Sequence, residues 1–202
     1  MSHNIDKIIY INLNKRSDRR EEIENELNKF GLEYERFEAI DVPHFGQLGC
    51  AISHLSVLKI AKERGYKNIL ILEDDFTFTV TKDEFENQLN SFFNSNINYN
   101  VCMLSYNLIK HTESNYKFLF KALDVQTTSG YIVNSNYYDK LINIFEPNIQ
   151  FLAESKRTDL YSVDVVWKKL QPNDDWFCFI NRIGIQRPSY SDIEYSFVEY
   201  GV

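Results

Sequence analysis

A short apolar run that ends in three consecutive acids most constrains how this chain can fold. Residues 69–72 read Ile-Leu-Ile-Leu, and Glu73, Asp74 and Asp75 follow directly. A run this short and rich in isoleucine, bounded by Gly65 and a polar cluster, predicts a strand buried on both faces. Open α/β sheets bind their ligands in the crevice beyond the carboxyl ends of the strands. The acids are therefore expected at a ligand-binding edge of a sheet.

The three acids favour a bound cation. Neighbouring carboxylates repel one another unless a positive charge joins them, and a hard divalent cation with oxygen ligands suits them. Such a cation can hold a phosphate, which points to metal-assisted chemistry on a nucleotide. On an extended strand Glu73 and Asp75 share a face, so both are candidate metal ligands, and Asp74 would contact metal, ribose or metal-bound water. The alternatives are a solvated acidic turn, or a capping role for Glu73 or Asp74.

Composition is typical of a single globular domain. The 202 residues are 44% hydrophobic and 25% charged, which suffices for one sizeable core. No linker, repeat or low-complexity block divides the chain, so we expect one domain over residues 1–202. Twenty-two basic residues against 29 acidic ones give a net charge of −7. Because the basic residues form no stripe, we expect no nucleic-acid partner.

The cysteines and the hydropathy pattern favour a cytoplasmic protein. Cys50, Cys102 and Cys178 lie far apart in apolar stretches, which predicts buried free thiols and a reducing compartment. The sequence contains no secretion signal and no run of about 18 apolar residues. We therefore expect no membrane span.

Strands and helices are predicted to alternate through the first half of the chain. Ser17 is expected to cap the first helix, and Thr81 with Glu84 reads as a capping box for the third. Residues 116–123 and 125–133 resemble an antiparallel pair. The expected strands are 7–13, 34–40, 69–72, 100–106, 176–180 and 183–186, and the expected helices are 17–30, 48–64, 81–92, 136–145 and 163–170. This order predicts an α/β fold with a mixed, mainly parallel sheet flanked by helices.

Six segments, in order along the chain, are similar to motifs of one family. They read INLNKRSDRR, FEAIDV, LGCAISHLSVLKIA, ILILEDDF, TSGYIVNSNYYDKLI and IQRPSYSDIE. The chain thus resembles glycosyltransferase family 25, which includes bacterial lipopolysaccharide glycosyltransferases and collagen β-galactosyltransferases. The resemblance implies a GT-A (Rossmann-like) fold and a UDP-sugar donor, usually with Mn²⁺ or else Mg²⁺. It also implies inverting transfer onto an acceptor hydroxyl.

The resemblance places the nucleotide near the end of the first strand. Backbone groups of Asn12 and Leu13 would read the uracil edge, and Arg16 and Arg19 would balance the phosphate charge. The alternative for Arg19 is an ion pair with a glutamate of its own helix.

Two further segments are expected to face the donor. Ser53 and His54 match the family's helix motif and are assigned to the donor site, with a satisfied structural histidine as the alternative. Thr127 and Gly130 resemble the segment that faces the donor sugar. The threonine hydroxyl would bond a sugar hydroxyl, and the glycine would let the backbone approach closely.

The last third of the chain supplies the other candidates. Asp164 is the expected general base, because it lies beside apolar residues that could raise its pKa; a plain helix cap is the alternative. Asp192 is a candidate metal ligand from the closing motif, with Gln186 beside it in the donor site. Trp167 and Trp176 would suit an acceptor platform, or else pack in the core.

These observations predict a metal-dependent, inverting glycosyltransferase. It would move galactose or glucose from a UDP-sugar to a hydroxyl of a glycan or a hydroxylated side chain. The alternative from another class is a non-catalytic, GT-A-like nucleotide-sugar-binding module or partner subunit. A nucleotidyltransferase would also use acids with a metal, but it would usually carry a glycine-rich phosphate loop early in the chain. INLNKRSDRR has no glycine.

Overall fold

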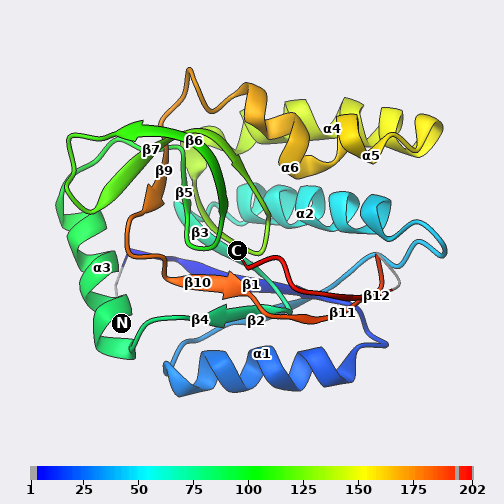
Figure 1. Ribbon diagram of the computed structural model, residues 1–202, viewed down its shortest axis with the longest axis horizontal. Coiled ribbons are helices and arrows are strands. Elements are labelled where there is room, and N and C mark those ends of the chain that lie inside the picture. The colour runs from blue at the N-terminus through cyan, green and yellow to red at the C-terminus, as the bar shows by residue number, and fades with distance from the viewer. Residues whose placement is uncertain (1–3, 194–195, 202) are drawn as a thin grey trace.

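An eight-stranded sheet runs through the molecule, and helices cover both of its faces (Figure 1). The computed structural model describes residues 4–193 and 196–201. The strand order is β2-β1-β3-β8-β5-β9-β7-β6, and only β8 and β7 run against the others. The bounds are β1 (Lys7–Asn12), β2 (Glu35–Glu38), β3 (Asn68–Glu73), β5 (Val101–Met103), β6 (Asn107–Glu113), β7 (Leu119–Gln126), β8 (Gly130–Asn134) and β9 (Trp176–Phe179). The expected mixed, mainly parallel sheet is confirmed.

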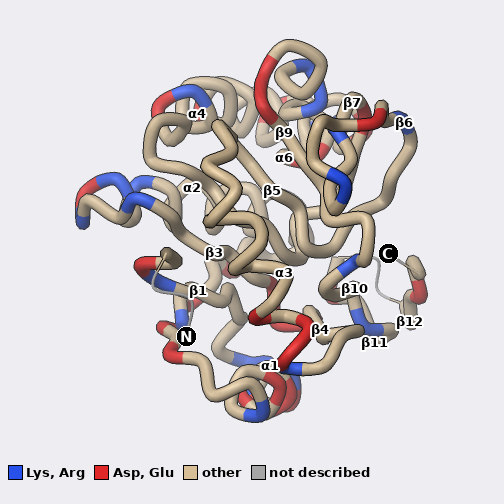
Figure 2. The backbone as a smooth tube through the Cα atoms, turned by 90° about the vertical axis from the view of Figure 1, so that its left-hand side faces the viewer, with Lys and Arg blue, Asp and Glu red and all other residues tan. Residues whose placement is uncertain are grey.

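The central strands are buried on both faces, as the apolar run predicted. In β3, Ile69 and Ile71 face one core and Leu70 and Leu72 face the other. The helices that cover the first core, above the sheet in Figure 1, are α2 (Gly46–Glu63), α4 (Tyr138–Ser155), α5 (Thr158–Tyr161) and α6 (Val163–Val166). The second core lies under α1 (Ser17–Lys29) and α3 (Lys82–Asn94). Charged residues lie mainly on the peripheral helices and loops (Figure 2).

Two small ribbons lie beside the main sheet. β4 (Phe76–Phe78) follows the acids directly and pairs with β10 (Gly184–Gln186). β11 (Ser189–Ser191) pairs with β12 (Ser196–Val198). Both ribbons lie above α1 in the view of Figure 1. They bring the end of the chain to the carboxyl end of β3.

Some predicted elements are wrong in pairing or extent. Residues 116–123 and 125–133 are not an antiparallel pair, because β7 pairs with β6 and β9 whereas β8 pairs with β3 and β5. The apolar strand β8 lies at the sheet centre between β3 and β5, and its apolar run alone does not indicate which strands it pairs with. Helix α4 continues past Pro147 to Ser155, where buried Leu152 packs into the core.

The helix starts differ as well. Arg16, rather than Ser17, occupies the N-cap position of α1, and no side chain caps that end. The capping box of Thr81 and Glu84 is confirmed.

Two further predictions concern the state of the cysteines and the absence of a membrane span. The three cysteines are free thiols, as expected, but only Cys102 and Cys178 are buried; Cys50 is partly exposed. Among the helices that the structure describes, none has both the length and the apolar character that crossing a bilayer requires.

Candidate functional site

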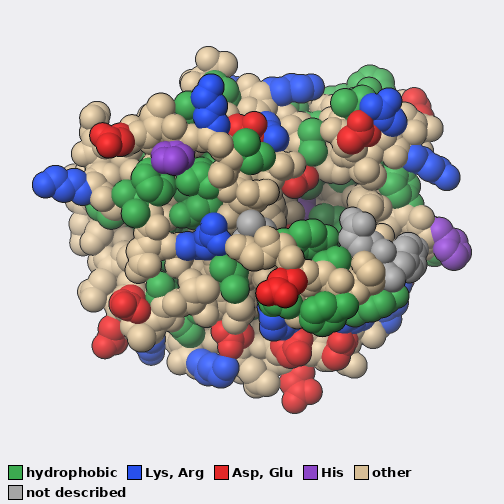
Figure 3. All heavy atoms as spheres, in the orientation of Figure 1, with side chains coloured by type: hydrophobic (Ala, Val, Ile, Leu, Met, Phe, Trp, Pro, Cys, Tyr) green, Lys and Arg blue, Asp and Glu red, His purple; other side chains and the backbone are tan. Residues whose placement is uncertain are grey.

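The three acids meet a cavity at the carboxyl end of β3. Glu73 ends the strand, and Asp74 and Asp75 form the turn into β4. The strand therefore stops before Asp75, and the turn rather than an extended strand sets how the carboxylates lie. All three acids line a cavity of about 210 Å³. Figure 3 shows a hollow in the middle of this face of the molecule, with acidic side chains beside it.

Asp75 has a buried oxygen that no described group satisfies. Its Oδ2 accepts hydrogen bonds from Arg19 Nη1 at 3.2 Å and Gln186 Nε2 at 3.1 Å. Its Oδ1 is buried and has no partner among the described residues. Burial and the charges of Glu73 and Asp74 raise the pKa of Asp75 to about 7. A cation beside Oδ1 would give this oxygen a partner and would offset the burial and the negative charges that raise the pKa. Asp75 therefore fits the expected metal ligand.

Asp74 is held by protein partners. Asn12 Nδ2 donates to its Oδ2 at 2.8 Å, and Arg19 Nη1 donates to its Oδ1 at 2.8 Å. Burial raises the pKa of Asp74, and the charge of Arg19 opposes that rise. Asp74 therefore fixes the arginine over the acid turn.

Glu73 contacts a different set of residues, on the other side of the turn. Its Oε1 lies 3.2 Å from His54 Nε2 and accepts a hydrogen bond from the Thr128 hydroxyl. The other ring nitrogen of His54, Nδ1, lies 2.9 Å from the hydroxyl of Tyr131. Burial alone would raise the pKa of Glu73, but its bond to His54 and the charge of that ring lower it overall.

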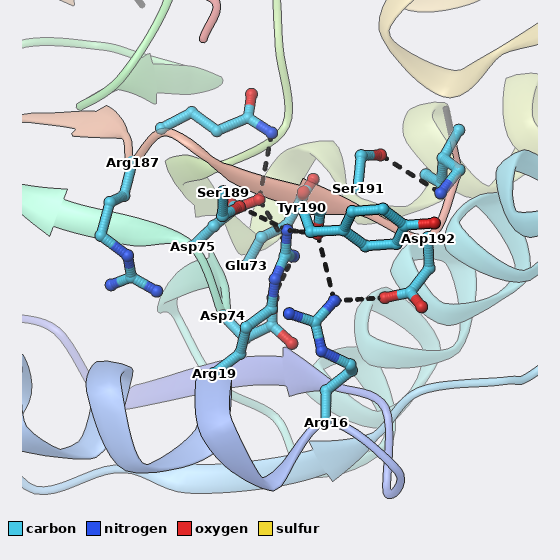
Figure 4. Close-up of polar contacts among 12 residues, drawn as sticks. Arg16, Arg19, Glu73, Asp74, Asp75, Arg187, Ser189, Tyr190, Ser191 and Asp192 are labelled. Carbon is cyan, nitrogen blue, oxygen red and sulfur yellow. Dashed lines mark hydrogen bonds and ion pairs between the residues drawn. The ribbon is translucent and has the colours of Figure 1, made fainter. Parts of the chain in front are cut away.

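Two arginines of the first helix tie the closing motif over the acids (Figure 4). Arg19 Nη2 donates to Ser189 Oγ at 2.6 Å and to the Tyr190 carbonyl at 3.0 Å. Arg16 Nη1 donates to the same carbonyl at 3.2 Å and pairs with Asp192. The alternative of a same-helix ion pair for Arg19 is therefore wrong. Arg19 Nε is buried without a partner among the described residues.

A second, polar cavity adjoins the first. Its volume is about 350 Å³, and Cys50, Glu73 and Gln186 belong to the walls of both cavities. Asp164 and Thr127 line it as well. Asp164 lies in the first turn of α6, whose N-cap is Ser162, so the cap alternative for Asp164 is wrong. Burial raises the pKa of Asp164, and its Oδ2 accepts from the Thr127 backbone N–H at 3.4 Å.

Thr127, at the second cavity, has an unusual backbone conformation. Its φ is +82°, a conformation that a β-branched residue adopts only under strain. The side-chain hydroxyl lies 3.4 Å from Gln186 Oε1, which joins the β7–β8 connection to β10. Strained backbone of this kind is often found at functional sites, and the role of Thr127 toward the donor sugar stays a prediction.

The structure brings most predicted residues to the cavities. Those that line one or both are Leu13, Arg16, Arg19, His54, Glu73, Asp74, Asp75, Thr127, Asp164, Gln186 and Asp192. Asp192 is a first-cavity residue whose carboxylate is engaged by Arg16, so its role as metal ligand stays a prediction. Sequence reasoning gave no role to Cys50, although it lies in the helix motif.

Several predicted residues lie beneath the cavities instead. Ser53 is fully buried, and its hydroxyl donates to the Gly49 carbonyl and accepts from the Ile40 amide. Asn12 is buried and bonded to Asp74, and Gly130 packs against a phenylalanine. The side chains of Ser53 and Asn12 are thus engaged within the protein, whereas the expected backbone roles of Asn12 and Gly130 stay predictions.

Trp167 and Trp176 are fully buried. The acceptor platform expected of them is wrong, because their rings pack edge to face in the core, with centroids 5.1 Å apart.

Comparison with known proteins identifies the family. The sequence model of glycosyltransferase family 25 (LPS biosynthesis protein) matches residues 44–166. Two proteins named as glycosyltransferase 25 family members, from Drosophila melanogaster and Drosophila pseudoobscura pseudoobscura, are each 30% identical over 101 residues. Each match covers 37% of this chain and 16% of the relative. The chain thus spans well under two thirds of the length of these relatives.

A solved structure shares the fold over almost the whole chain. It is a glycosyltransferase involved in glycosylation of the major capsid of PBCV-1, with a TM-score of 0.56 and 12% identity. The likeness covers 94% of this chain and 95% of that one. The expected GT-A-like fold is confirmed.

Proposed function

The chain belongs to glycosyltransferase family 25, and on this basis we propose that it is a metal-dependent, inverting hexosyltransferase. It would move galactose or glucose from a UDP-sugar to a hydroxyl of a glycan, such as lipopolysaccharide, or of a hydroxylated side chain. One observation carries the proposal. Asp75 Oδ1 and Arg19 Nε are buried and unpartnered among the described residues, and both residues line the same cavity. A metal-bound diphosphate supplies a cation for the first atom and an anion for the second.

The residues present fit a divalent cation of the Mn²⁺ or Mg²⁺ kind. Asp75 would hold it, with Glu73 beside it and Asp192 joining only on release from Arg16. When bound, the cation neutralises the charge that develops on the diphosphate leaving group. Arg16 and Arg19 add positive charge to the same cavity.

The second cavity suits the sugar and the acceptor. Asp164 would take the proton of the acceptor hydroxyl as that oxygen bonds to the sugar carbon and the bond to the diphosphate breaks. Its raised pKa favours this role near neutral pH. The hydroxyls of Thr127 and Thr128, which line the cavity, would bond the sugar hydroxyls. Attack from the face opposite the leaving group inverts the sugar carbon.

Calorimetric titration with UDP-galactose, UDP-glucose and UDP, each with and without Mn²⁺, tests this proposal. We expect one UDP-sugar to bind in a metal-dependent manner. Asp75→Asn should weaken that binding by about tenfold or more, because it removes a charged metal ligand. Asp159→Asn, an exposed change on α5, is the matched control and should bind like the wild type. If the folded wild type bound no UDP-sugar, the proposal would be wrong and a binding module of other specificity would take its place.

A further inference from the structure

Three side chains of different chemistry meet between the two cavities. Cys50 and His54 lie one turn apart on α2, so both project from the same face of the helix. Glu73 reaches them from the end of β3. The Cys50 sulfur, a ring nitrogen of His54 and a carboxylate oxygen of Glu73 all lie within 4.8 Å of one another. A small contraction would place all three around one ion.

The surrounding residues hold two of these ligands in position. Tyr131 is fully buried, and its hydroxyl lies 2.9 Å from His54 Nδ1. When Nδ1–H donates to that hydroxyl, Nε2 keeps its lone pair for a cation. The Thr128 hydroxyl donates to Glu73 in the same way. Metal-binding histidines and carboxylates usually have such outer partners, which fix their orientation.

Access distinguishes Cys50 from the other cysteines. Cys50 is partly exposed and lines both cavities. Cys102 and Cys178 are fully buried within β5 and β9, where a thiol acts as a small apolar side chain. An ion from solvent can therefore reach the Cys50 sulfur through the cavities.

We infer that Cys50, His54 and Glu73 form a binding site for one zinc ion, which adjoins the hard-cation site proposed at Asp75 and shares Glu73 with it. A thiolate, an imidazole and a carboxylate together select zinc over manganese or magnesium, which prefer oxygen ligands. Three protein ligands leave a fourth position open toward the cavities, as in open zinc sites. On binding, the Cys50 thiol releases its proton to solvent and the sulfur bonds to the ion. The occupied site also withdraws Glu73 from a cation at Asp75.

Cobalt binding tests the site without any sugar donor, so the result is independent of the proposed function. Co²⁺ is titrated into metal-free protein in a reducing buffer. We expect a thiolate-to-cobalt charge-transfer band that saturates at one ion per chain. Zn²⁺ should abolish the band, and a large excess of Mn²⁺ should not, because manganese ranks lowest for such ligands.

Variants identify the ligands. Cys50→Ser should remove the charge-transfer band, whereas Cys102→Ser, the matched control, should keep it. Tyr131→Phe should keep the band but weaken cobalt affinity by about tenfold to a hundredfold, since it removes only an outer partner. Circular dichroism checks that each variant is folded. The inference is overturned if folded wild-type protein gives no thiolate band, if Mn²⁺ displaces cobalt as readily as Zn²⁺, or if the band survives in Cys50→Ser.

Discussion

Asp74 and Asp75 are neighbours in sequence but differ in how their oxygens are satisfied. Both oxygens of Asp74 accept hydrogen bonds, from Asn12 and Arg19. Asp75 keeps one buried oxygen without a partner among the described residues. An unsatisfied buried carboxylate destabilises the fold, so its presence is better explained by a ligand than by folding.

The first prediction concerns the metal-free protein and its pH dependence. The pKa of Asp75 is about 7 in the folded state and about 4 in an unfolded chain. Between these values the folded state binds more protons, so the contribution of Asp75 to the free energy of unfolding falls as pH rises. We compare the free energy of unfolding of the wild type with that of Asp75→Asn. The difference, wild type minus variant, should fall by up to about 1.4 kcal/mol per pH unit between these two pKa values and level off above pH 7. Denaturant unfolding of both proteins in the presence of a chelator measures this difference. A difference that does not change with pH would contradict the prediction.

A second prediction concerns Asp164. Asp164→Asn removes the proposed base, so turnover should fall by about a hundredfold or more. Affinity for UDP should stay close to that of the wild type, because Asp164 does not line the first cavity, where the nucleotide diphosphate is proposed to bind. UDP release measured with a panel of acceptor sugars gives turnover, and calorimetry gives affinity. Unchanged turnover would assign the base to another residue, and Asp159→Asn again serves as control.

At the scale of elements, close packing fixes the acid turn. Phe76 follows Asp75 directly, and its ring lies against a glycine of β8 and a glycine of β10. A Cβ atom would lie 2.7 Å from this ring at Gly130 and 2.2 Å from it at Gly184. Both glycines are therefore needed for three strands to meet beneath the carboxylates.

The third prediction follows from this packing. Gly184→Ala should lower the free energy of unfolding by roughly 1–3 kcal/mol, through overpacking against Phe76. It should also weaken metal-dependent donor binding, because Phe76 positions Asp75. Gly65→Ala is the control: φ is +69° there with nothing within 4 Å, so it should cost about 1 kcal/mol and leave donor binding unchanged. Denaturant unfolding measures the stability of both variants, and calorimetry measures their donor binding. Equal donor binding by the two variants would show that Phe76 does not position Asp75.

At the scale of the whole molecule, local sequence patterns predicted where strands and helices lie along the chain better than they predicted which strands pair with one another. The apolar runs at β1 and β3 were recognised because burial on both faces leaves a local signature. The place of β8 between β3 and β5 was not recognised, because an apolar run indicates that a strand is buried but not which strands it pairs with. The same limit applies to Arg16 and Asp192, which pair across 176 positions.

The candidate site shows a similar division. The acids were predicted to lie at the cavity because charge at the end of a buried strand is visible in the sequence, and the arginines because their segment resembles the family's opening motif. Ser53 was misplaced because a motif does not reveal whether a hydroxyl bonds to the backbone or faces a cavity. Cys50 received no role, since its partner Glu73 lies on another element.

The attachment of β11 to α1 has a consequence for protein synthesis. Arg16 and Arg19 come early in the chain, but the backbone and Asp192 that they hold come late. A chain that lacks β11 therefore lacks the backbone and the carboxylate that hold these arginines over the acids. Translation that stops before β11 would release a chain in which these arginines have lost their late partners. β11, although it comes late in the chain, thus completes the first cavity.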